Sequence, residues 1–307
     1  MNSTITAVPG VTVGHAASLQ DVTGCTVLLG PFRAAVDVRG LATGTREIDA
    51  LQPTHLVPQI DALLLTGGSA PGLAAADGVV QWLREHERGF YVGVTHIPIV
   101  PAAVIFDIHK PGQRSPDAAM GRAACMAANS DAVAEGRVGA GAGATVGKLR
   151  GPQFASPGGL GSFAVQHGEY TVGALAVVNA FGDVIDYSNQ IVAGTRRDDG
   201  GFLDSMSALL QASGATGRPI SNTTLCALAT DAPLTRTALQ TVARMGSSAV
   251  VRRIAPANTI FDGDVVFAMS TSGVAQELPP DQLLSIGVAA QLVLEEAILR
   301  AVLAAKT

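Results

Sequence analysis

Short apolar runs bounded by turn residues recur along the chain. Residues 172–178 form one such run, and residues 223–230 form another that contains only apolar residues and threonine. Runs of this length and composition are typical of strands buried on both faces. We therefore predict buried strands at residues 25–29, 34–38, 62–65, 89–94, 172–178, 223–230 and 264–269.

Longer segments with helical spacing of apolar residues lie between these runs. They predict helices at residues 72–87, 115–128, 202–211, 234–244 and 281–305. The two kinds of element alternate, which indicates a mixed α and β fold. Residues 212–221 are polar and contain glycine, so they are the most linker-like stretch of the chain. A cut there would sever a loop and leave the predicted elements intact.

Composition and charge restrict the classes of function. The chain has 307 residues, 48% of them hydrophobic, which is enough for one large core or two modest ones. Its net charge is −5 and it has no basic run, so nucleic acid and anionic membranes are not expected partners. No apolar stretch approaches the roughly 18 residues of a membrane span, and the first residues do not resemble a signal peptide. We therefore expect a cytoplasmic protein.

Neither metal nor disulfide chemistry is indicated by the cysteines and histidines. Cys25, Cys125 and Cys226 are far apart and form no CxxC pair, and the six histidines are scattered without an HExxH or similar motif. We expect these residues to be structural or to lie at the surface. The 35 glycines and the 4% of aromatic residues favour layers that pack closely together.

A glycine-rich stretch at residues 138–145 matches the dinucleotide-binding pattern GxGxxG/A by spacing. That motif needs a hydrophobic strand directly before it, because the strand places the turn against the pyrophosphate. Residues 129–137 are polar and charged instead. The sequence therefore does not predict a nucleotide cofactor here.

Two further motifs are incomplete. Gly147 and Lys148 resemble the end of a phosphate-binding loop, but Leu149 occupies the position of the Ser or Thr that binds magnesium. Residues 67–71 (GGSAP) miss the GxSxG pattern of serine hydrolases because proline occupies the last position. Ser69 nevertheless follows a predicted strand at a sharp turn, so it remains an alternative nucleophile.

The pair Asn222-Thr223 at the start of a predicted strand suggests a different chemistry. An N-terminal threonine combines nucleophile and base, because its α-amino group, with a pKa of about 7.7–8.0, can accept the hydroxyl proton. Such an amine exists only if the chain is cut, and the Thr223 hydroxyl can make the cut by attacking the Asn222 carbonyl. Taken alone, the pair is much more often a turn followed by a β-branched strand residue.

Matching stretches along nearly the whole chain decide between these interpretations. The sequence resembles the DmpA/NylC-type family of self-cleaving aminopeptidases and amidases, which are N-terminal-nucleophile-like hydrolases. The stretches are residues 10–15 (GVTVGH), 36–40 (VDVRG), 65–70 (LTGGSA), 100–107 (VPAAVIFD), 139–148 (GAGAGATVGK), 222–232 (NTTLCALATDA) and 261–264 (FDGD).

The resemblance implies an α+β fold, a four-layer αββα sandwich, formed by residues 1–307 as one domain. It implies self-cleavage into a large subunit, 1–222, and a small subunit, 223–307, that stay together and assemble further, commonly as a tetramer of such heterodimers. It also implies a small amide or short peptide substrate and no metal or organic cofactor.

The resemblance assigns the nucleophile to Thr223 and the residue before the cut to Asn222. It places Asp262 and Asp264 at an acidic pair beside the nucleophile. We expect one carboxylate to accept a hydrogen bond from Thr223 and the other to orient the first. The aminopeptidase members have a serine nucleophile and a Ser-Gly-Glu arrangement here, so this chain is nearer to the nylon-oligomer hydrolase.

Three more positions carry implied roles. Asn179 matches a position whose amide helps to form the oxyanion site, and Lys148 matches a residue near the nucleophile, where a cation stabilises a developing alkoxide. Phe106 replaces a tyrosine that lies near the substrate in the nylon-oligomer hydrolase. Substrate contacts therefore do not transfer from that enzyme, and Phe106 and Ser69 remain residues expected to line the pocket.

Three hypotheses follow from the sequence. The first is a self-processing amide hydrolase that acts through a threonyl ester. The second is a serine hydrolase that uses Ser69. The third is a protein of the same fold that binds a small molecule without catalysis.

Overall fold

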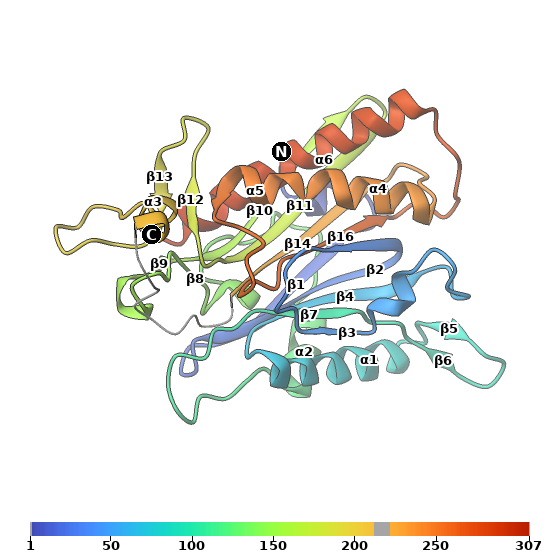
Figure 1. Ribbon diagram of the computed structural model, residues 1–307. Coiled ribbons are helices and arrows are strands. Elements are labelled where there is room, and N and C mark those ends of the chain that lie inside the picture. The colour runs from blue at the N-terminus through green and yellow to red at the C-terminus, as the bar shows by residue number, and fades with distance from the viewer. Residues whose placement is uncertain (1, 212–221, 307) are drawn as a thin grey trace.

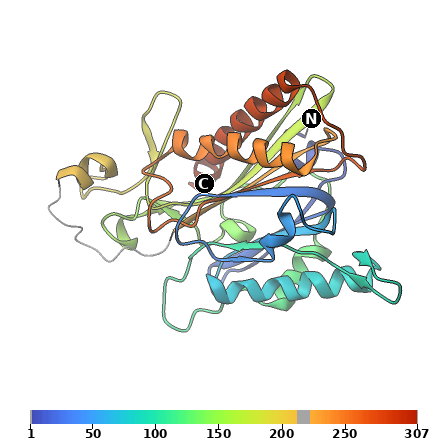
Figure 2. The ribbon, with the colours of Figure 1, turned by 45° about the vertical axis from the view of Figure 1, so that its right-hand side comes forward.

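The computed structural model describes residues 2–211 and 222–306, and they form four layers (Figure 1). Two β-layers lie in the middle, α4 (Arg236–Gly246), α5 (Ser248–Arg253) and α6 (Pro280–Ala304) cover one of them, and α1 (Ala75–Glu85) and α2 (Ala118–Met126) cover the other. The same layers are visible after a rotation of 45° (Figure 2). The predicted αββα sandwich is confirmed.

The two β-layers are continuous through one long strand. They contain β1 (Thr12–Ser18), β2 (Thr23–Val38), β3 (Thr45–Arg46), β4 (Ile60–Thr66), β7 (Ala102–Val104), β10 (Gly159–His167), β11 (Tyr170–Asn179), β14 (Thr223–Thr230) and β16 (Val265–Ser270). The first part of β2 pairs with β1 and β4, and its last part pairs with β16. The register shifts between Leu29 and Phe32, so β2 bends there and passes from one layer to the other.

Three separate hydrophobic clusters fill the three spaces between the four layers. Strand β14 shows the reason, because its side chains alternate between two of them. Leu225 and Ala227 belong to the cluster between the sheets, whereas Cys226 and Leu228 belong to the cluster under α4 and α6. Since both faces of β14 are covered, the strand reads as a continuous apolar run, as the sequence indicated.

Strands from the two sides of residue 222 are interleaved. The order of the strands is β10-β11-β14-β16-β2-β4-β7-β3, so β14 and β16 lie between β11 and β2. Strand β14 pairs antiparallel with β11, and β16 pairs antiparallel with β2. Residues 223–306 therefore contribute the central strands of a sheet whose outer strands come from residues before 222.

Short 3-10 helices and short strands lie outside these layers. Five short 3-10 helices are Ile5–Ala7 (η1), Ile48–Leu51 (η2), Ala70–Ala74 (η3), Gly139–Gly141 (η4) and Pro152–Phe154 (η5). Strands β8 (Thr145–Val146) and β9 (Ser156–Pro157) pair, as do β5 (Phe90–Tyr91) and β6 (His96–Ile97).

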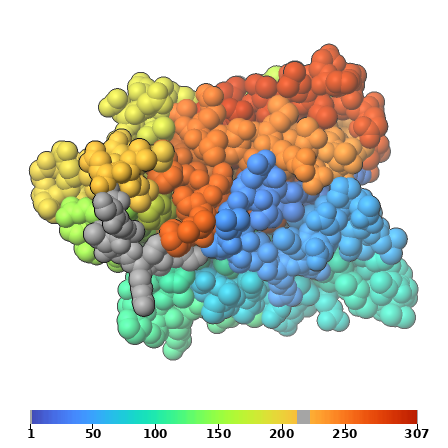
Figure 3. All heavy atoms as spheres, in the orientation of Figure 1, coloured from blue at the N-terminus to red at the C-terminus, as the bar shows by residue number. Residues whose placement is uncertain are grey.

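An arm formed by residues 183–211 projects from one end of the molecule (Figure 3). It contains β12 (Asp183–Ile185), β13 (Ile191–Ala193) and α3 (Ser205–Gln211), and β12 pairs with β15 (Ile254–Ala255). Helix α3 leads directly into residues 212–221. The predicted linker at these positions lies outside the described residues.

Several sequence-based boundaries were wrong. Residues 25–29 and 34–38 belong to one strand, β2. Residues 89–94 were predicted as a buried strand, but they form the first strand and the turn of an exposed hairpin, in which Val94 is 89% exposed. Strand β10 was not predicted, because its first part is rich in glycine. The predicted helices are present, with 72–87 shortened to α1 after the turn of η3.

Candidate functional site

The register between β11 and β14 places two predicted site residues side by side. Asn179 is the last residue of β11, Thr223 is the first residue of β14, and the two are direct partners across the antiparallel pair. Both are buried, with Thr223 2% exposed and Asn179 0% exposed. Side chains of directly opposite residues lie on the same face of a sheet, so the threonine hydroxyl and the asparagine amide share one side.

The peptide group between Asn222 and Thr223 is held by the chain around Asp262. Asn222 and Asp262 form a parallel bridge: the Asn222 N–H donates to the Phe261 carbonyl over 2.8 Å, and the Gly263 N–H donates to the Asn222 carbonyl over 2.8 Å. The Thr223 hydroxyl also donates to the Asn222 carbonyl. The carbonyl oxygen before Thr223 therefore accepts hydrogen bonds from a backbone amide and from the hydroxyl of the next residue.

Gly263 occupies a position that admits no side chain. A Cβ atom there would lie 2.7 Å from the Thr223 hydroxyl and 2.8 Å from the Ala42 carbonyl. The absence of a side chain lets the backbone of Gly263 approach Thr223 closely. This explains the glycine between the two aspartates.

Asp262 is held by hydrogen bonds from Phe181, which lies just before the arm, and from Thr259 in the preceding loop. Its Oδ1 accepts the Phe181 N–H over 3.3 Å, and its Oδ2 accepts the Thr259 N–H over 3.0 Å and the Thr259 hydroxyl over 2.5 Å. Burial raises the pKa of Asp262, and these hydrogen bonds together with Lys148 oppose the increase. The carboxyl group is thus fixed in place by three donors.

Asp264 is anchored beside the strand that carries the nucleophile candidate. Its Oδ1 accepts the Thr224 N–H over 2.6 Å, and its Oδ2 accepts the Asn258 N–H over 2.9 Å. Burial first, and the nearby charge of Asp262 second, raise the pKa of Asp264 to about 7. The pKa of Asp264 is thus raised by burial and by a second carboxylate nearby, and the two groups titrate as an interacting pair.

Lys148 approaches Asn179 from the glycine-rich stretch. Its Nζ donates to the Asn179 Oδ1 over 2.8 Å and to the Asn179 carbonyl over 3.3 Å, and its own N–H donates to the Phe181 carbonyl over 3.0 Å. Burial lowers the pKa of Lys148 to about 7, while the charges of Asp262 and Asp107 raise it. At neutral pH the side chain is therefore poised between ammonium and amine.

The amide of Asn179 has a fixed orientation. Its Oδ1 accepts from Lys148 and from the Thr145 N–H over 3.0 Å, and its Nδ2 donates to the Phe106 carbonyl over 3.0 Å. An amide nitrogen has two N–H donors, and only one of them is needed for the Phe106 carbonyl. Asn179 thus keeps a second donor on the same side chain.

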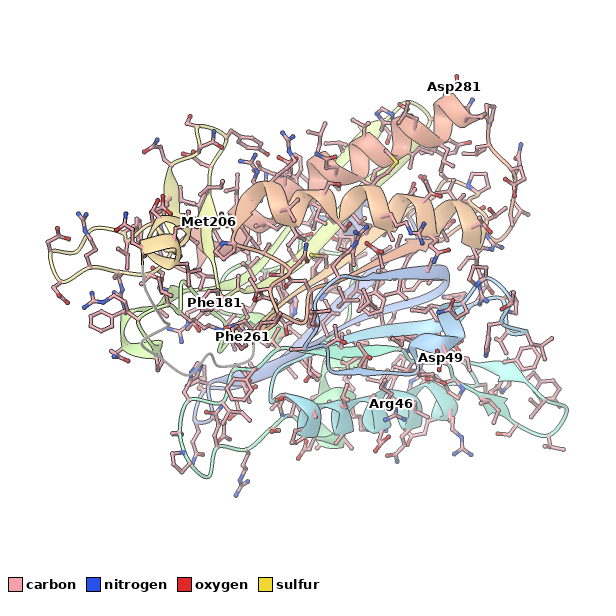
Figure 4. The ribbon with its side chains drawn as sticks, in the orientation of Figure 1. Arg46, Asp49, Phe181, Met206, Phe261 and Asp281 are labelled. Atoms are coloured by element: carbon pink, nitrogen blue, oxygen red, sulfur yellow. The ribbon has the colours of Figure 1, made fainter. Side chains whose placement is uncertain are left out.

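Two phenylalanines frame this group. Phe181 follows Asn179 by two residues, Phe261 precedes Asp262, and their ring centroids are 6.4 Å apart (Figure 4). Their backbones also contribute, because the Phe261 carbonyl accepts from Asn222 and the Phe181 N–H donates to Asp262. The rings give the group an apolar border.

The structure thus gathers Thr223, Asn222, Asn179, Lys148, Asp262 and Asp264, with the Phe106 backbone, into one network. One expectation takes a different form in the uncut chain: no hydrogen bond among the described residues joins Asp262 or Asp264 to the Thr223 side chain. Both carboxylates bind backbone amides. They lie near Thr223 because Gly263, which separates them in the sequence, packs against the Thr223 hydroxyl, and because Asp264 accepts the Thr224 N–H. The predicted bond to the threonyl amine concerns the cut chain and stays a prediction.

Ser69 lies outside this network. It is in the turn after β4 with φ 55°, and its N–H donates to the Ile105 carbonyl over 2.9 Å. Among the residues that the structure describes, its hydroxyl has no hydrogen bond to a histidine or a carboxylate, which a serine nucleophile needs for activation. Nothing in this geometry supports the serine-hydrolase hypothesis.

The sequence analysis missed Asp107 and Gly263. Asp107 directly follows Phe106 and is fully buried. The available signal was an acidic residue at the end of the apolar stretch 99–106, which is unusual for a buried segment. Gly263 was taken only as part of a turn between two aspartates.

Residues 2–211 and 222–306 contain no group of three or more potential metal ligands. Within the same ranges, no helix is both long enough and apolar enough to cross a membrane.

The four-layer sandwich has the fold of the Ntn (N-terminal-nucleophile) hydrolases. The structure aligns with that of the L-aminopeptidase D-Ala-esterase/amidase from Ochrobactrum anthropi, described as a variant of the Ntn hydrolase fold, with TM-score 0.74, 20% identity and coverage of 99% of this chain and 86% of that one. A β-aminopeptidase from Burkholderia sp. aligns with TM-score 0.74, 23% identity and coverage of 99% and 87%.

The chain belongs to Peptidase family S58, which matches residues 3–307. The uncharacterized aminopeptidase Rv1333 of Mycobacterium tuberculosis is 43% identical over 300 residues, covering 92% of this chain and 84% of the relative. The 6-aminohexanoate-oligomer endohydrolase of Paenarthrobacter ureafaciens is 31% identical over 276 residues, covering 87% and 74%. The protein is therefore a hydrolase of amide bonds, as the sequence predicted.

Proposed function

We propose that the protein is made as a single-domain precursor that cuts itself between Asn222 and Thr223, and that Thr223 is then the nucleophile for amide hydrolysis. The observation that carries this proposal is the peptide group before Thr223. Its carbonyl oxygen accepts from the Gly263 N–H and from the Thr223 hydroxyl, so the attacking group and a donor for the developing oxyanion are both in contact with it.

The cut proceeds in two steps. The Thr223 oxygen attacks the Asn222 carbonyl carbon, the bond to the Thr223 nitrogen breaks, and the hydroxyl proton is transferred to that nitrogen. Water then hydrolyses the resulting ester, which releases the Asn222 carboxylate and restores the hydroxyl. The Gly263 N–H stabilises the charge on the Asn222 oxygen in both steps.

The new amino group changes the chemistry of the site. With a pKa of about 7.7–8.0, the Thr223 amine can accept the hydroxyl proton while the hydroxyl attacks a substrate amide, and it can return that proton to the leaving amine. Asn179 supplies an amide donor for the substrate oxyanion, and Lys148 fixes the orientation of that amide. Asp262 and Asp264 lie one residue to either side of Gly263 and stabilise the threonyl ammonium.

For the substrate we propose amino-terminal amides, short peptides or ω-amino-acid oligomers. The named relatives support this range, since one set is named aminopeptidase and another 6-aminohexanoate-oligomer endohydrolase. The rings of Phe181 and Phe261 lie next to each other beside the site, and this apolar surface suits a substrate with an aliphatic chain.

A panel of substrates tests this range. We expect purified protein to release product from at least one of three groups: amino-acid p-nitroanilides, β-peptides and aminohexanoate oligomers. The Thr223→Ala variant serves as the blank. Cut protein that turns over none of the three groups at micromolar enzyme would contradict the proposed substrate class, although not the cut itself.

We further propose that the two fragments stay together and that several copies assemble. The interleaved strands support the first part, because separation would expose the edge of β14 that pairs with β11 and the edge of β16 that pairs with β2. An apolar groove of about 790 Å³ along α6 supports the second. Leu284, Val288 and Leu292 line it at helical spacing and are 58%, 47% and 53% exposed, which favours burial against a second copy.

Size-exclusion chromatography with light scattering measures both parts at once. We expect fragments 1–222 and 223–307 to elute together without denaturant, at a mass that is a multiple of the 31.2 kDa of the chain. Changing Val288 to Glu would lower that mass to a single heterodimer if the groove is the interface. Fragments that separate under native conditions would refute the interleaved assembly.

A further inference from the structure

Two arginines connect the parts of the chain that lie on either side of the proposed cut. Arg33 is in β2, and Arg236 is the first residue of α4. Arg33 is half-buried, and Arg236 is only 9% exposed. Within residues 2–211 and 222–306, neither guanidinium has a carboxylate within 4.0 Å. Charges in such positions need other hydrogen-bond partners.

Arg33 reaches from the large fragment to the small one. Its Nη1 donates to the Val274 carbonyl over 2.9 Å, to the Leu234 carbonyl over 3.3 Å and to the Ser272 carbonyl over 3.5 Å. Leu234 lies in the loop after β14, and the other two lie in the loop after β16. A bridge between Leu234 and Gln276 joins these two loops. Arg33 therefore binds both loops that follow the central strands of the small fragment.

Arg236 reaches in the opposite direction. Its Nη1 donates to the Gln52 carbonyl over 2.9 Å and to the His55 carbonyl over 3.2 Å, and its Nη2 donates to the Val57 carbonyl. These three carbonyls belong to the loop between η2 and β4, in the large fragment. Each arginine thus binds three backbone carbonyls of the other fragment, and the arrangement is reciprocal.

The position of Arg236 in its own helix is unfavourable for a cation. Helix α4 begins there, with Thr235 as the N-cap residue that accepts the Ala238 N–H over 3.2 Å. The amino end of a helix favours negative charge, so a guanidinium in the first turn is disfavoured. Burial first, and the charge of Arg33 second, lower the pKa of Arg236. The local structure does not favour arginine here, whereas the three carbonyls of the other fragment account for it.

These contacts lie at the end of the sheet that is remote from the cut. Strand β14 begins with Thr223, has eight residues, and runs parallel to β16. The loops that Arg33 binds are therefore about 25 Å from Thr223 along the strand. Near the cut, backbone groups join the fragments, since the N–H groups of Arg39 and Gly40 both donate to the Asp264 carbonyl over 3.0 Å. The two ends of the fragment interface are thus held by different contacts.

We propose that Arg33 and Arg236 form a reciprocal arginine clamp that holds the two fragments of the cut protein together at the end remote from Thr223. The proposal rests on the proposed cut, because in an uncut chain the same contacts join two parts of one polypeptide. A guanidinium suits this task because it presents five N–H donors in a fixed plane and can bind several carbonyls at once. Separation of paired strands begins with local opening at their ends, and the clamp opposes that opening.

Release of the large fragment from an immobilised small fragment tests the clamp. A histidine tag after residue 307 immobilises every copy of the small fragment, because one gene encodes both fragments. Denaturing electrophoresis then measures how fast residues 1–222 leave the resin at a fixed, sub-denaturing concentration of urea. We expect release to be at least about tenfold faster in Arg33→Met and in Arg236→Met than in the wild type, and faster still in the double variant.

Arg244→Met is the matched control. Arg244 is an exposed arginine on the same helix, and within the described ranges its side chain has no hydrogen bond to the large fragment. Its replacement should leave the release rate unchanged. Two bands on the gel with wild-type release in both clamp variants would overturn the proposal. A single band of 307 residues would instead refute the proposed cut, so the two failures are distinguishable.

The uncut Thr223→Ala chain separates a clamp from a requirement for folding. In this background the covalent link between the fragments is kept, so both clamp variants should fold, as circular dichroism and chromatography would report. An arginine variant that fails to fold even as an uncut chain would assign that arginine to folding and overturn its role as a clamp.

In the cut enzyme the clamp has a kinetic signature. Because both arginines lie far from Thr223, kcat/KM of the double variant should equal that of the wild type when the fragments are together at micromolar concentration. After dilution to nanomolar concentration, its activity should decay at the rate of fragment release, while the wild type stays active. Equal persistence of activity in the two proteins after dilution would contradict the clamp.

Discussion

Changing Thr223 to alanine is expected to leave a single uncut chain of 307 residues and to reduce amide hydrolysis by at least about a thousandfold. The variant loses the hydroxyl that contacts the Asn222 carbonyl, so neither the acyl shift nor the threonyl ester can form. It also never gains the amino group that serves as base. Denaturing electrophoresis and a p-nitroanilide assay measure the two losses.

Two controls sharpen this result. Thr223→Ser keeps a hydroxyl at the same place and should still be cut. Ser69→Ala should be cut and active as in the wild type, because Ser69 has no activating partner among the described residues. An active Thr223→Ala protein, or an inactive Ser69→Ala protein that is correctly cut, would reverse the assignment of the nucleophile.

Changing Asn179 to aspartate is expected to lower kcat/KM by about a hundredfold to a thousandfold, the usual cost of losing one oxyanion donor. The change is nearly isosteric. The carboxylate can still accept from Lys148 and from the Thr145 N–H, but it can no longer donate to a substrate oxygen. The new negative charge also repels the developing oxyanion.

In the same variant, the rate of the self-cleavage should fall much less than kcat/KM and stay near the wild-type rate. During the cut, the charge develops on the Asn222 oxygen, which accepts from the Gly263 N–H, whereas the Asn179 Nδ2 donates to the Phe106 carbonyl. Comparing the rate of cutting with kcat/KM therefore separates the two oxyanion sites. Asn129→Asp, at an exposed position, is the control for the added charge. Equal losses in both rates would contradict separate sites.

The layers of the fold could be predicted from the sequence because buried strands and helices have regular patterns of apolar residues. Strand β14 is apolar on both faces, as residues 223–230 indicated, and the helical spacing of residues 281–305 predicted α6 to within one residue at each end. The hairpin at residues 89–97 has the same apolar and β-branched composition. Composition alone cannot tell that no layer covers it.

For the candidate site, the sequence predicted side chains but no backbone groups. Thr223, Asn179, Lys148, Asp262 and Asp264 were identified, and the register and turns bring them together. The Gly263 N–H and the Phe106 carbonyl were not, because backbone groups have no signature in the sequence. The buried Asp107 was not identified either, because it ends an apolar stretch and belongs to no motif.

The order of the strands also bears on maturation. Because β14 and β16 lie inside the sheet, residues 223–307 must have folded with the rest of the chain before the cut. The proposed cut would then take place in a formed core, and the new amino terminus would appear beside Asn179 with its neighbours already in place. Maturation of this kind exposes the nucleophile without rebuilding the site.

Intact-mass spectrometry of the purified wild-type protein under denaturing conditions tests the central claim most directly. The account predicts two polypeptides, residues 1–222 and residues 223–307, with an unblocked threonine as the first residue of the second. A single polypeptide of 307 residues that hydrolyses amides at full rate would contradict it.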